Sequence, residues 1–357
     1  MVVTRPIYLV TGAAGFIGSA LCRYLCTQQQ ARVIGLDKMT YAASREAVAM
    51  LKPDAFRLVE GDINDTALVS RLLAEEQPDG VFHLAAETHV DRSIDGPLAF
   101  VQANVTGTAS LLEAVRHYWA ALPGARRDAF RFLHVSTDEV YGSLGAEGAF
   151  TEDMAYAPNS PYAASKAGAD HLARAWHKTY GLPVIISNCS NNYGPYQFPE
   201  KLIPLCIAKA LRGEAIPVYG QGLNVRDWLY VEDHAAALHL VLTQGRLGEK
   251  YNVGGAAERR NIDVVQTLCR MLDDLRPRST QSYAQLITYV TDRPGHDERY
   301  AMDFTKLQRE LGWQPRMSFE TGLRQTVEWY LANEPWVETI RARKYSGERL
   351  GQIKASA

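Results

Sequence analysis

Three glycines near the N-terminus impose the strongest constraint on this chain. Gly12, Gly15 and Gly18 follow an apolar run at 7–10 that suits a buried strand, and a helical pattern begins at residue 19. In this spacing Gly12 permits a tight turn, Gly15 lets the backbone approach a phosphate, and Gly18 lets the helix pack closely on the strand. A pyrophosphate binds at such a helix N-terminus, so the sequence predicts a dinucleotide-binding loop.

The second expected strand, at 32–36, ends in an acidic residue. Asp37 follows the glycine loop by roughly twenty residues, where a carboxylate accepts hydrogen bonds from the adenosine ribose hydroxyls. A carboxylate there repels the 2′-phosphate of NADP, so NAD is the favoured cofactor. The charge of Lys38 could partly offset this preference.

Apolar strand-like runs alternate with helical patterns as far as residue 195. The expected strands are 7–10, 32–36, 56–62, 80–86, 130–136 and 184–188, and the expected helices are 19–25, 66–76, 99–122 and 162–180. This order predicts an α/β fold with a Rossmann-type doubly wound parallel sheet, whose ligands lie beyond the carboxyl ends of the strands.

The later part of the chain is irregular and richer in proline and glycine, which predicts a smaller α/β lobe that closes over a substrate. We expect an NAD-binding domain with the catalytic residues at 1–195 and a C-terminal tail at 336–357. Between them, 196–335 would mainly bind substrate, with some segments returning to the first domain.

Composition restricts the partners of the chain. The 357 residues carry a formal net charge of −2, so we expect no nucleic-acid or membrane partner. The sequence has no long apolar run and no signal-peptide pattern, so we expect a cytoplasmic protein. The five cysteines include no C-x-x-C pair and the nine histidines no H-x-x-x-H set, so we expect reduced thiols and no metal site.

Tyr162 and Lys166 lie four residues apart, on one face of an expected helix. An unperturbed tyrosine has a pKa of about 10 and is a poor base at neutral pH, unless a cation favours its phenolate. Lys166 and an oxidised nicotinamide would supply positive charge, and Thr137 lies at the end of the preceding strand. The sequence predicts that Tyr162 takes a hydroxyl proton while hydride leaves the same carbon for NAD.

Two carboxylates, Asp138 and Glu139, directly follow Thr137. Removing water from a sugar beside a ketone requires a base for the proton next to the carbonyl and an acid for the departing hydroxyl. Two neighbouring carboxylates can divide these roles if burial and the partner's charge keep one protonated. The alternative is that the pair only starts a helix. Their position after Thr137 favours an elimination.

Three motifs carry a resemblance to a known family. The motifs are Thr-Gly-x-x-Gly-Phe-Ile-Gly at 11–18, Ser-Thr-Asp-Glu-Val-Tyr-Gly at 136–142 and Tyr-x-x-x-Lys at 162–166. They resemble the extended short-chain dehydrogenase/reductases, and among these the NAD-dependent sugar-nucleotide 4,6-dehydratases. Further matching segments are 83–93, 187–195, 198–205, 226–234 and 292–297.

The resemblance implies dTDP-glucose as substrate and tightly bound NAD that is regenerated in each turnover. Tyr162 would deprotonate the 4-hydroxyl as hydride passes to NAD, with Thr137 hydrogen-bonding the same oxygen. Glu139 would then remove the proton at carbon 5 while Asp138 protonates the leaving 6-hydroxyl. Return of hydride to carbon 6 would give dTDP-4-dehydro-6-deoxy-D-glucose.

The resemblance also implies the binding residues. Those around NAD are Gly12, Gly15, Phe16, Ile17, Gly18, Asp37, Lys38, Met39, Thr40, Asp62, Ile63, Leu84, Ala85, Ala86, Thr88, Tyr162, Lys166 and Asn192. Those around the substrate are Thr88, Thr137, Asn191, Lys201, Leu202, Pro217, Val218, Tyr219, Arg226, Asn261, Asp292, Arg293 and His296. Arg226 and Arg293 suit a diphosphate because a guanidinium forms paired hydrogen bonds with phosphate oxygens, although surface ion pairing is their alternative role.

Apolar residues on more than one face of the helices expected at 99–122 and 162–180 indicate a homodimer built on a helix bundle. The examples are Leu111, Leu112, Val115, Tyr118 and Trp119.

Three other functions stay open. The same dehydration could act on a UDP- or GDP-linked sugar. A sugar-nucleotide 4-epimerase would have no use for Asp138 and Glu139, and a non-catalytic NAD-binding sensor would not require Tyr162, Lys166 or the carboxylates.

Overall fold

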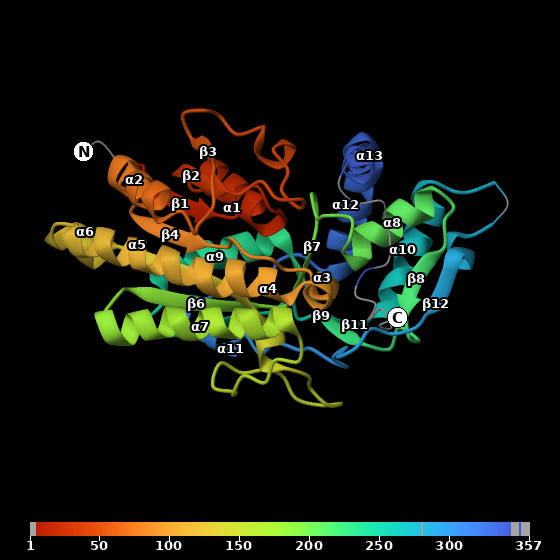
Figure 1. The fold of residues 1–357 in the computed structure, drawn as a ribbon. Coiled ribbons are helices and arrows are strands. Elements are labelled where there is room, and N and C mark those ends of the chain that lie inside the picture. Colours follow the sequence, from red (N-terminus) through yellow and green to blue (C-terminus); the bar gives the residue numbers. More distant parts are fainter. Residues whose placement is uncertain (1–4, 280, 344–349, 351–357) are drawn as a thin grey trace, which may run out of the picture.

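A seven-stranded parallel sheet forms the centre of the larger lobe (Figure 1). The computed structural model describes residues 5–279, 281–343 and 350. The sheet contains β1 (Ile7–Thr11), β2 (Arg32–Asp37), β3 (Phe56–Glu60), β4 (Gly80–His83), β5 (Arg131–Thr137), β6 (Val184–Cys189) and β10 (Lys250–Val253). Its order is β10-β6-β5-β4-β1-β2-β3, so the chain changes direction across the sheet between β1 and β4. The predicted doubly wound fold is confirmed.

The strand register brings the carboxyl ends of the central strands to one edge. Thr11 pairs with Leu36 on one side and with His83 on the other. Thr137, the last residue of β5, pairs with Cys189, the last residue of β6. The side chains that the sequence places at strand ends therefore meet at the edge where ligands of such sheets bind.

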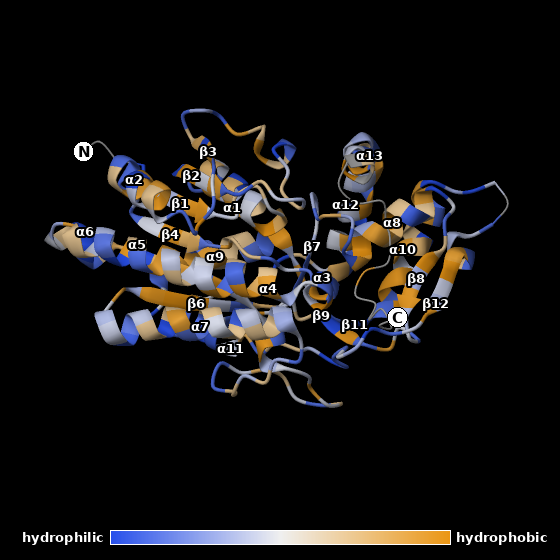
Figure 2. Cartoon of the chain, viewed as in Figure 1, coloured by the Kyte–Doolittle hydropathy of each residue, from blue (hydrophilic) through white to orange (hydrophobic). Residues whose placement is uncertain are grey.

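Helices cover both faces of this sheet (Figure 1). One layer contains α1 (Phe16–Thr27), α9 (Val231–Gln244) and α11 (Thr305–Leu311), and the other contains α2 (Thr66–Glu76), α5 (Gly107–Ala121) and α7 (Pro161–Tyr180). Figure 2 shows hydrophobic colours along β1 and β6 and mostly hydrophilic colours on α6 (Gly124–Ala129) and α7.

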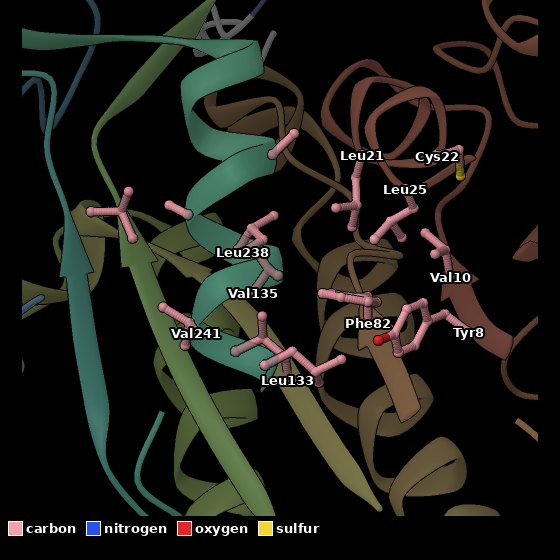
Figure 3. Close-up of a cluster of buried hydrophobic side chains, with 14 of the residues drawn as sticks. Tyr8, Val10, Leu21, Cys22, Leu25, Phe82, Leu133, Val135, Leu238 and Val241 are labelled. Atoms are coloured by element: carbon pink, nitrogen blue, oxygen red, sulfur yellow. The ribbon is translucent and has the colours of Figure 1, made fainter. Parts of the chain in front are cut away.

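Neighbouring strand residues point into opposite cores, which explains their continuous apolar runs. Val10 and Phe82 pack with Leu21 of α1 and Leu238 of α9 in the first core (Figure 3). Their sequence neighbours Leu9 and Val81 pack in the second core against α2 and α5. Leu111, Leu112, Val115, Tyr118 and Trp119 all pack against this second core, so they do not form a second exposed face.

The single helix expected at 99–122 is interrupted. It consists of α4 (Pro97–Phe100), a π-helical turn at 101–106 and then α5. Within that turn Asn104 is buried, and its side-chain amide pairs with the backbone N–H and C=O of Glu87 at 2.8 and 2.9 Å. Such π turns are common at functional sites, and this one fixes the loop that follows β4.

The smaller lobe is more regular than the sequence indicated. Its helices are α8 (Leu202–Leu211), α10 (Asn261–Leu275), α12 (Phe319–Ala332) and α13 (Glu334–Arg343). Its sheets are β11-β9-β7, formed by Glu258–Arg260, Val225–Tyr230 and Asn191–Tyr193, and the parallel pair of β8 (Ile216–Tyr219) and β12 (Ile287–Val290). Ile207, Leu268 and Leu323 belong to its core. The short α3 (Val90–Asp95) lies at the boundary between the lobes.

The chain crosses between the lobes several times. After β9 it returns to the large sheet as α9 and β10, and after β12 it returns as α11. The domain boundaries at 195 and 335 stay predictions. Of the expected tail at 336–357, residues up to 343 continue α13, and residues 344–349 and 351–357 lie outside the described part of the chain.

Three features of the described residues concern membrane spans, metal clusters and disulfides. No helix among them combines the length and apolar character needed to cross a bilayer. They contain no cluster of three or more His, Cys, Asp or Glu residues that could hold a metal ion. All five cysteines are free thiols.

Candidate active site

A cleft of about 500 Å³ runs along the carboxyl ends of the central strands. Its walls include every residue expected around NAD except Met39, and all five expected catalytic residues. Thr88, Thr137, Asn191 and Lys201 of the expected substrate set also line it. The structure therefore brings together side chains from 12–201 that are distant in sequence.

The glycine-rich turn leaves no room for side chains at two of its three positions. Gly12 has a φ of +71°, and an added Cβ would lie 2.8 Å from the backbone nitrogen of Ala85. A Cβ on Gly18 would lie 2.0 Å from the carbonyl oxygen of Gly12, so the helix packs directly on the turn. Gly15 precedes the first residue of α1, where backbone N–H groups are unpaired within the helix. This arrangement fits a bound pyrophosphate.

Asp37 is buried at the end of β2 and is held by the backbone. Its Oδ2 accepts a hydrogen bond from Ala14 N at 2.9 Å, and its Oδ1 accepts one from Met39 N at 2.8 Å. Lys38 is engaged elsewhere, since its Nζ lies 2.7 Å from Oδ2 of Asp62. Burial raises the pKa of Asp62, but hydrogen bonds from Asn64 and Lys38 outweigh it and lower the pKa. A glycine turn beside a fixed carboxylate fits the pyrophosphate and ribose of a dinucleotide.

Helix α7 presents Tyr162 and Lys166 to the cleft. Its start is fixed by Ser160, whose hydroxyl accepts a hydrogen bond from Ala163 N at 3.1 Å, and by Pro161 at the first helical position. Both side chains are buried, and Lys166 donates to the carbonyl oxygen of Val135 at 2.9 Å. Burial, followed by the charge of Glu139, raises the pKa of Tyr162 well above its usual range. Nearby positive charge is therefore required before Tyr162 can act as a base.

Thr137 and Asp138 form a hydrogen-bonded pair at the end of β5. Thr137 Oγ1 donates to Asp138 Oδ1 at 3.1 Å and accepts from Glu139 N at 3.3 Å, which starts a short 3-10 turn. Asp138 Oδ2 is buried and has no hydrogen-bond partner among the described residues. Burial and the charge of Glu139 raise the pKa of Asp138 well above its usual range. The structure therefore favours a neutral carboxylic acid at this position.

Glu139 has a different environment from its neighbour. Burial raises the pKa of Glu139, and the charges of Arg293, Lys201 and Arg226 oppose this rise without reversing it. Glu139 is also less buried than Asp138. Two adjacent carboxyl groups thus have environments that favour a proton donor at Asp138 and a proton acceptor at Glu139.

A buried polar network that the sequence analysis missed contacts the catalytic residues on the protein side of the cleft. Asp170 accepts hydrogen bonds from the Tyr156 hydroxyl at 2.8 Å and from Asn188 Nδ2 at 3.2 Å, and its Oδ1 lies 3.0 Å from His134 Nε2. The same Asn188 amide donates to the carbonyl oxygen of Thr137 at 3.2 Å. Asp170 follows Lys166 by one helical turn, and its charge opposes the lowering of the Lys166 pKa by burial. The spacing of Tyr162, Lys166 and Asp170 was the available signal.

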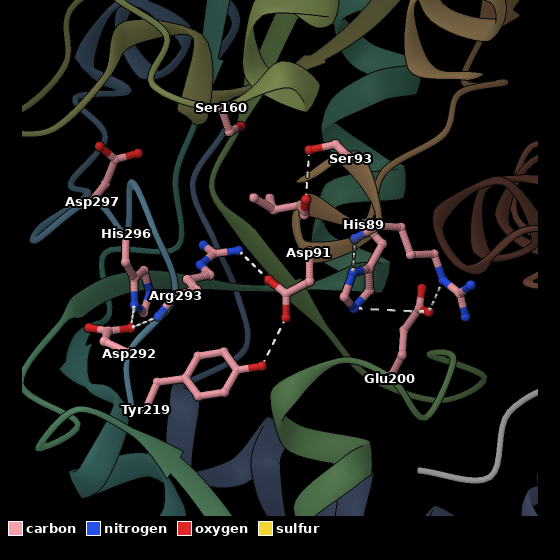
Figure 4. A network of polar contacts seen from close by, with 12 residues as sticks. His89, Asp91, Ser93, Ser160, Glu200, Tyr219, Asp292, Arg293, His296 and Asp297 are labelled. Atoms are coloured by element: carbon pink, nitrogen blue, oxygen red, sulfur yellow. Dashed lines mark hydrogen bonds and ion pairs between the residues drawn. The ribbon is translucent and has the colours of Figure 1, made fainter. Parts of the chain in front are cut away.

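Arg293 crosses from the smaller lobe to α3 (Figure 4). Its guanidinium lies 2.9 Å from Asp91 Oδ1, and the Tyr219 hydroxyl donates to Asp91 Oδ2 at 2.9 Å. The Arg293 side chain is only 15% exposed, so this contact differs from an ordinary surface ion pair. Near it, His296 Nδ1 lies 2.6 Å from Asp292 Oδ1, and burial with the charges of Arg293 and Arg226 lowers the His296 pKa to about 4.

The remaining expected substrate residues lie in the smaller lobe. Arg226 is buried over the ring of Tyr300, 4.1 Å from its centroid, and donates to the carbonyl oxygen of Asp297 at 2.9 Å. Leu202 begins α8, and Pro217 and Val218 lie on β8, away from the cleft walls. Among the expected substrate residues, all of which the structure describes, three carry a buried polar atom with no hydrogen-bond partner: Asn191 Oδ1, Asn261 Oδ1 and Arg293 Nε. Unpaired buried polar groups of this kind suit a polar ligand.

Glu200 is a second acidic residue that the sequence analysis missed. It lines the cleft, accepts from Arg92 Nε at 2.9 Å and from the Tyr41 hydroxyl at 3.2 Å, and Arg92 lies over the Tyr41 ring. Glu200 thereby ties the smaller lobe to the segment that follows β2.

Comparisons with known proteins agree with this geometry. The family model described as GDP-mannose 4,6 dehydratase matches residues 9–326. A dTDP-glucose 4,6-dehydratase of Xanthomonas campestris pv. campestris is 60% identical over 346 residues, which cover 96% of this chain and 98% of that protein.

The solved structures that resemble this chain include enzymes with two different activities, a dehydratase and an epimerase. A dTDP-glucose 4,6-dehydratase of Streptomyces venezuelae, with NAD and TYD bound, has a TM-score of 0.85 and 46% identity, covering 94% of this chain and 99% of its own. A UDP-glucose 4-epimerase of Thermotoga maritima, with UDP-glucose bound, has a TM-score of 0.80 but 28% identity, covering 92% and 99%. The fold is common to both, whereas sequence identity is higher with the dehydratase.

Proposed function

The chain belongs to the GDP-mannose 4,6 dehydratase family, and on that basis we propose that it is an enzyme with the activity of its dTDP-glucose 4,6-dehydratase relatives. It converts dTDP-glucose into dTDP-4-dehydro-6-deoxy-D-glucose. The observation that carries this proposal is the pair of Asp138 and Glu139 in the cleft beside Tyr162. Burial raises the pKa of both carboxyls, well above the usual range at Asp138, while the charges of Arg293, Lys201 and Arg226 oppose the rise at Glu139. An epimerase needs no such pair, because it eliminates no water.

The cofactor is NAD, which supplies a hydride acceptor that gives the hydride back within the same turnover. The backbone at Gly12, Gly15 and Gly18 holds its pyrophosphate, and Asp37 accepts hydrogen bonds from its adenosine ribose. The other residues expected around NAD, which line the same cleft apart from Met39, complete the site.

Tyr162 acts on the sugar 4-hydroxyl. Its phenolate takes the hydroxyl proton, and the positive charge of Lys166, one helical turn away, stabilises that phenolate. Thr137 hydrogen-bonds the same sugar oxygen. Asp170, held by His134, Tyr156 and Asn188, keeps Lys166 charged within a buried environment.

Asp138 and Glu139 perform the elimination. Once carbon 4 is a ketone, Glu139 removes the acidified proton at carbon 5, and Asp138 gives its proton to the 6-hydroxyl, which leaves as water. Glu139 exchanges this proton with solvent and then reprotonates carbon 5 when carbon 6 is reduced. Tyr162 is then protonated and Asp138 is not, so a proton passes from one to the other before the next turnover. Thr137 hydrogen-bonds Asp138, and its contact with Tyr162 opposes the rise of the Tyr162 pKa, so Thr137 bridges the two side chains.

The substrate diphosphate lies between the lobes. Arg226 and Arg293 bind it, and the unpaired atoms of Asn191 and Asn261 bind other polar groups of the nucleotide sugar. Lys201 and Thr88 lie at the boundary of the two ligands, where Lys201 Nζ donates to the Thr88 carbonyl at 3.0 Å. The other residues expected around the substrate, in the smaller lobe, complete this site.

The chain forms a homodimer through α4, α5 and α7. These helices lie side by side on one face of the larger lobe. Leu98 is 80% exposed, and Val101 and Tyr180 are about half exposed, so this face carries unburied apolar side chains. A second copy would cover them by two-fold symmetry. Light scattering during size-exclusion chromatography tests the dimer, and Leu98→Glu should yield monomers. A cytoplasmic location stays a prediction, which cell fractionation tests.

The central experiment incubates the protein with dTDP-glucose in deuterated water and identifies the product by NMR and mass spectrometry. We expect a 4-keto-6-deoxy sugar with deuterium at carbon 5. UDP-glucose in a parallel reaction tests the choice of nucleotide. A galactose epimer would establish the epimerase, and no turnover despite bound NAD would establish the sensor.

Two tyrosine variants connect this result to the site. Tyr162→Phe should prevent even the first hydride transfer, so bound cofactor should stay oxidised when dTDP-glucose is added. Tyr289→Phe, at a 57% exposed position of β12, is the matched control and should behave as the unaltered protein. Complete cofactor reduction by Tyr162→Phe would contradict the role of this residue.

A further inference from the structure

The C-terminal helix α13 packs back onto the segment that follows β2. The family model ends at residue 326, before this helix begins. Trp336 of α13 donates its indole N–H to Ser44 Oγ at 3.1 Å, across 292 positions of sequence. In Figure 1, α13 stands above α12 and near α8, at the top of the smaller lobe.

Ser44 connects this contact to the glycine-rich turn. Its backbone N–H donates to the carbonyl oxygen of Ala14 at 2.8 Å. Ala14 in turn donates its N–H to Asp37 Oδ2 at 2.9 Å. Trp336 is therefore linked through one residue to the turn that holds the pyrophosphate and through two residues to the carboxylate that holds the ribose.

An apolar contact reinforces the hydrogen bond. Ile340, one helical turn after Trp336, is buried against Phe198, Tyr41 and Ala42. The Tyr41 and Phe198 rings meet edge to face at 5.4 Å. The helix thus covers the outer side of this segment at two positions.

The inner side of the same segment faces the cleft. Thr40, Ala42 and Ala43 line the cleft, and Phe198 lines it from the smaller lobe. A dinucleotide that leaves past this wall requires the segment to move outward. Such a movement separates Trp336 from Ser44 and exposes Ile340 to water.

We propose that α13 is a strap that holds residues 40–48 against the glycine-rich turn and thereby slows the release of NAD. This inference rests on the proposed NAD site. Trp336 and Ile340 are positioning residues, because they act through Ser44 and Tyr41. A strap of this kind suits a cofactor that is regenerated in each turnover and does not need to exchange.

The test measures the rate at which NAD leaves the holoenzyme. Protein loaded with radiolabelled NAD is diluted into excess unlabelled NAD, and the label retained on the protein is followed with time. The variants are Trp336→Phe, which keeps an aromatic ring but loses the N–H donor, Ser44→Ala, and the double variant. Thr339→Ala is the matched control, since Thr339 is exposed on α13 and, among the described residues, its hydroxyl donates within the helix to the carbonyl of Pro335.

Trp336→Phe and Ser44→Ala should each release NAD about five times faster, which corresponds to about 1 kcal/mol. Ser44→Ala also removes the hydrogen bond that Ser44 Oγ donates to Glu46 Oε2 at 2.7 Å. The double variant should therefore be no faster than Ser44→Ala, because that variant has already lost the bond from Trp336. Turnover in excess NAD should be unchanged, since no catalytic side chain is altered. Equal release rates for these variants, Thr339→Ala and the unaltered protein would overturn the strap.

The unaltered protein separates this inference from the proposed function. If it retains no NAD at all, the NAD site itself is refuted. If it retains NAD and the variants release it at the unaltered rate, only the strap is refuted. Thermal unfolding of each variant without NAD shows whether its fold is intact. If Trp336→Phe is the only variant that releases NAD faster, and it also unfolds at a lower temperature, general loss of stability explains the faster release and the strap is refuted.

Discussion

Replacing Asp138 by Asn tests whether the buried carboxyl is the neutral proton donor. Asparagine matches a protonated aspartic acid in size but cannot titrate or donate this proton. Because the folded-state pKa of Asp138 is raised by burial and by Glu139, the folded protein keeps its proton at pH values where the unfolded chain has lost it. An unfolded aspartate has a pKa of about 3.9.

The sign and the size of the effect follow from this difference. When the pH rises above the unfolded-state pKa, Asp138 loses its proton in the unfolded chain but keeps it in the folded protein. The unfolded state of the unaltered protein is thereby stabilised, and the free energy of unfolding falls. The slope is about 1.4 kcal/mol per pH unit for one proton, and it ends when the pH reaches the folded-state pKa. Asp138→Asn lacks this loss, so its stability relative to the unaltered protein should increase by about 1.4 kcal/mol per unit over that window.

Urea unfolding of both proteins without NAD, at one protein concentration and several pH values from about 4 upward, measures this difference. Asp128→Asn, on the exposed α6, is the control for removing a surface carboxylate. The variant should also reduce its bound NAD on addition of dTDP-glucose yet eliminate water roughly 10²–10⁴ times more slowly. A stability difference that is constant with pH would mean that Asp138 is ionised in the fold and cannot be the acid.

Three further changes probe separate parts of the site. Glu139→Gln should bind NAD and dTDP-glucose but fail to exchange solvent deuterium into carbon 5, and NMR that shows normal exchange would exclude it as the base. Gly18→Ala places a Cβ 2.0 Å from Gly12 O, and strain of about 1–3 kcal/mol should weaken NAD binding by roughly 5–150-fold in calorimetry; unchanged affinity would contradict the close packing. Asp91→Asn frees Arg293 and should raise the KM for dTDP-glucose by about tenfold with little change in kcat, whereas a fall in kcat alone would point to catalysis instead.

The larger lobe was predictable from sequence because its signals are local. The helix expected at 66–76 has those bounds in the structure, since Asp65 caps its first turn and Gln77 ends it in a left-handed conformation. The parallel strands are buried on both faces and read as continuous apolar runs. The glycine turn and Tyr162 with Lys166 were visible because their spacing reflects local geometry.

The smaller lobe could not be predicted to the same extent because its strands are short and pair over long distances. β8 contains Pro217, which weakens any strand signal, and its partner β12 lies about seventy residues later. Likewise, Asp91 and Arg293 meet across 202 positions. The spacing of Asp170 from Lys166 was visible in the sequence, but its buried partners were not, because only the tertiary fold places His134 and Asn188 against it.

The repeated crossing of the chain between lobes has a consequence for how this protein can be divided. Leu238 and Val241 of α9 and Tyr251 of β10 fill the core against Leu21 and Leu25 of α1. A fragment that stops at residue 195 would keep α1 but lack α9 and α11, and so expose much of one face of its sheet. We expect it to aggregate rather than fold. Exchange of a single contiguous C-terminal piece between relatives would break the same core. The two lobes are therefore inherited as one cooperative unit, and new nucleotide specificity has to arise by substitutions within it.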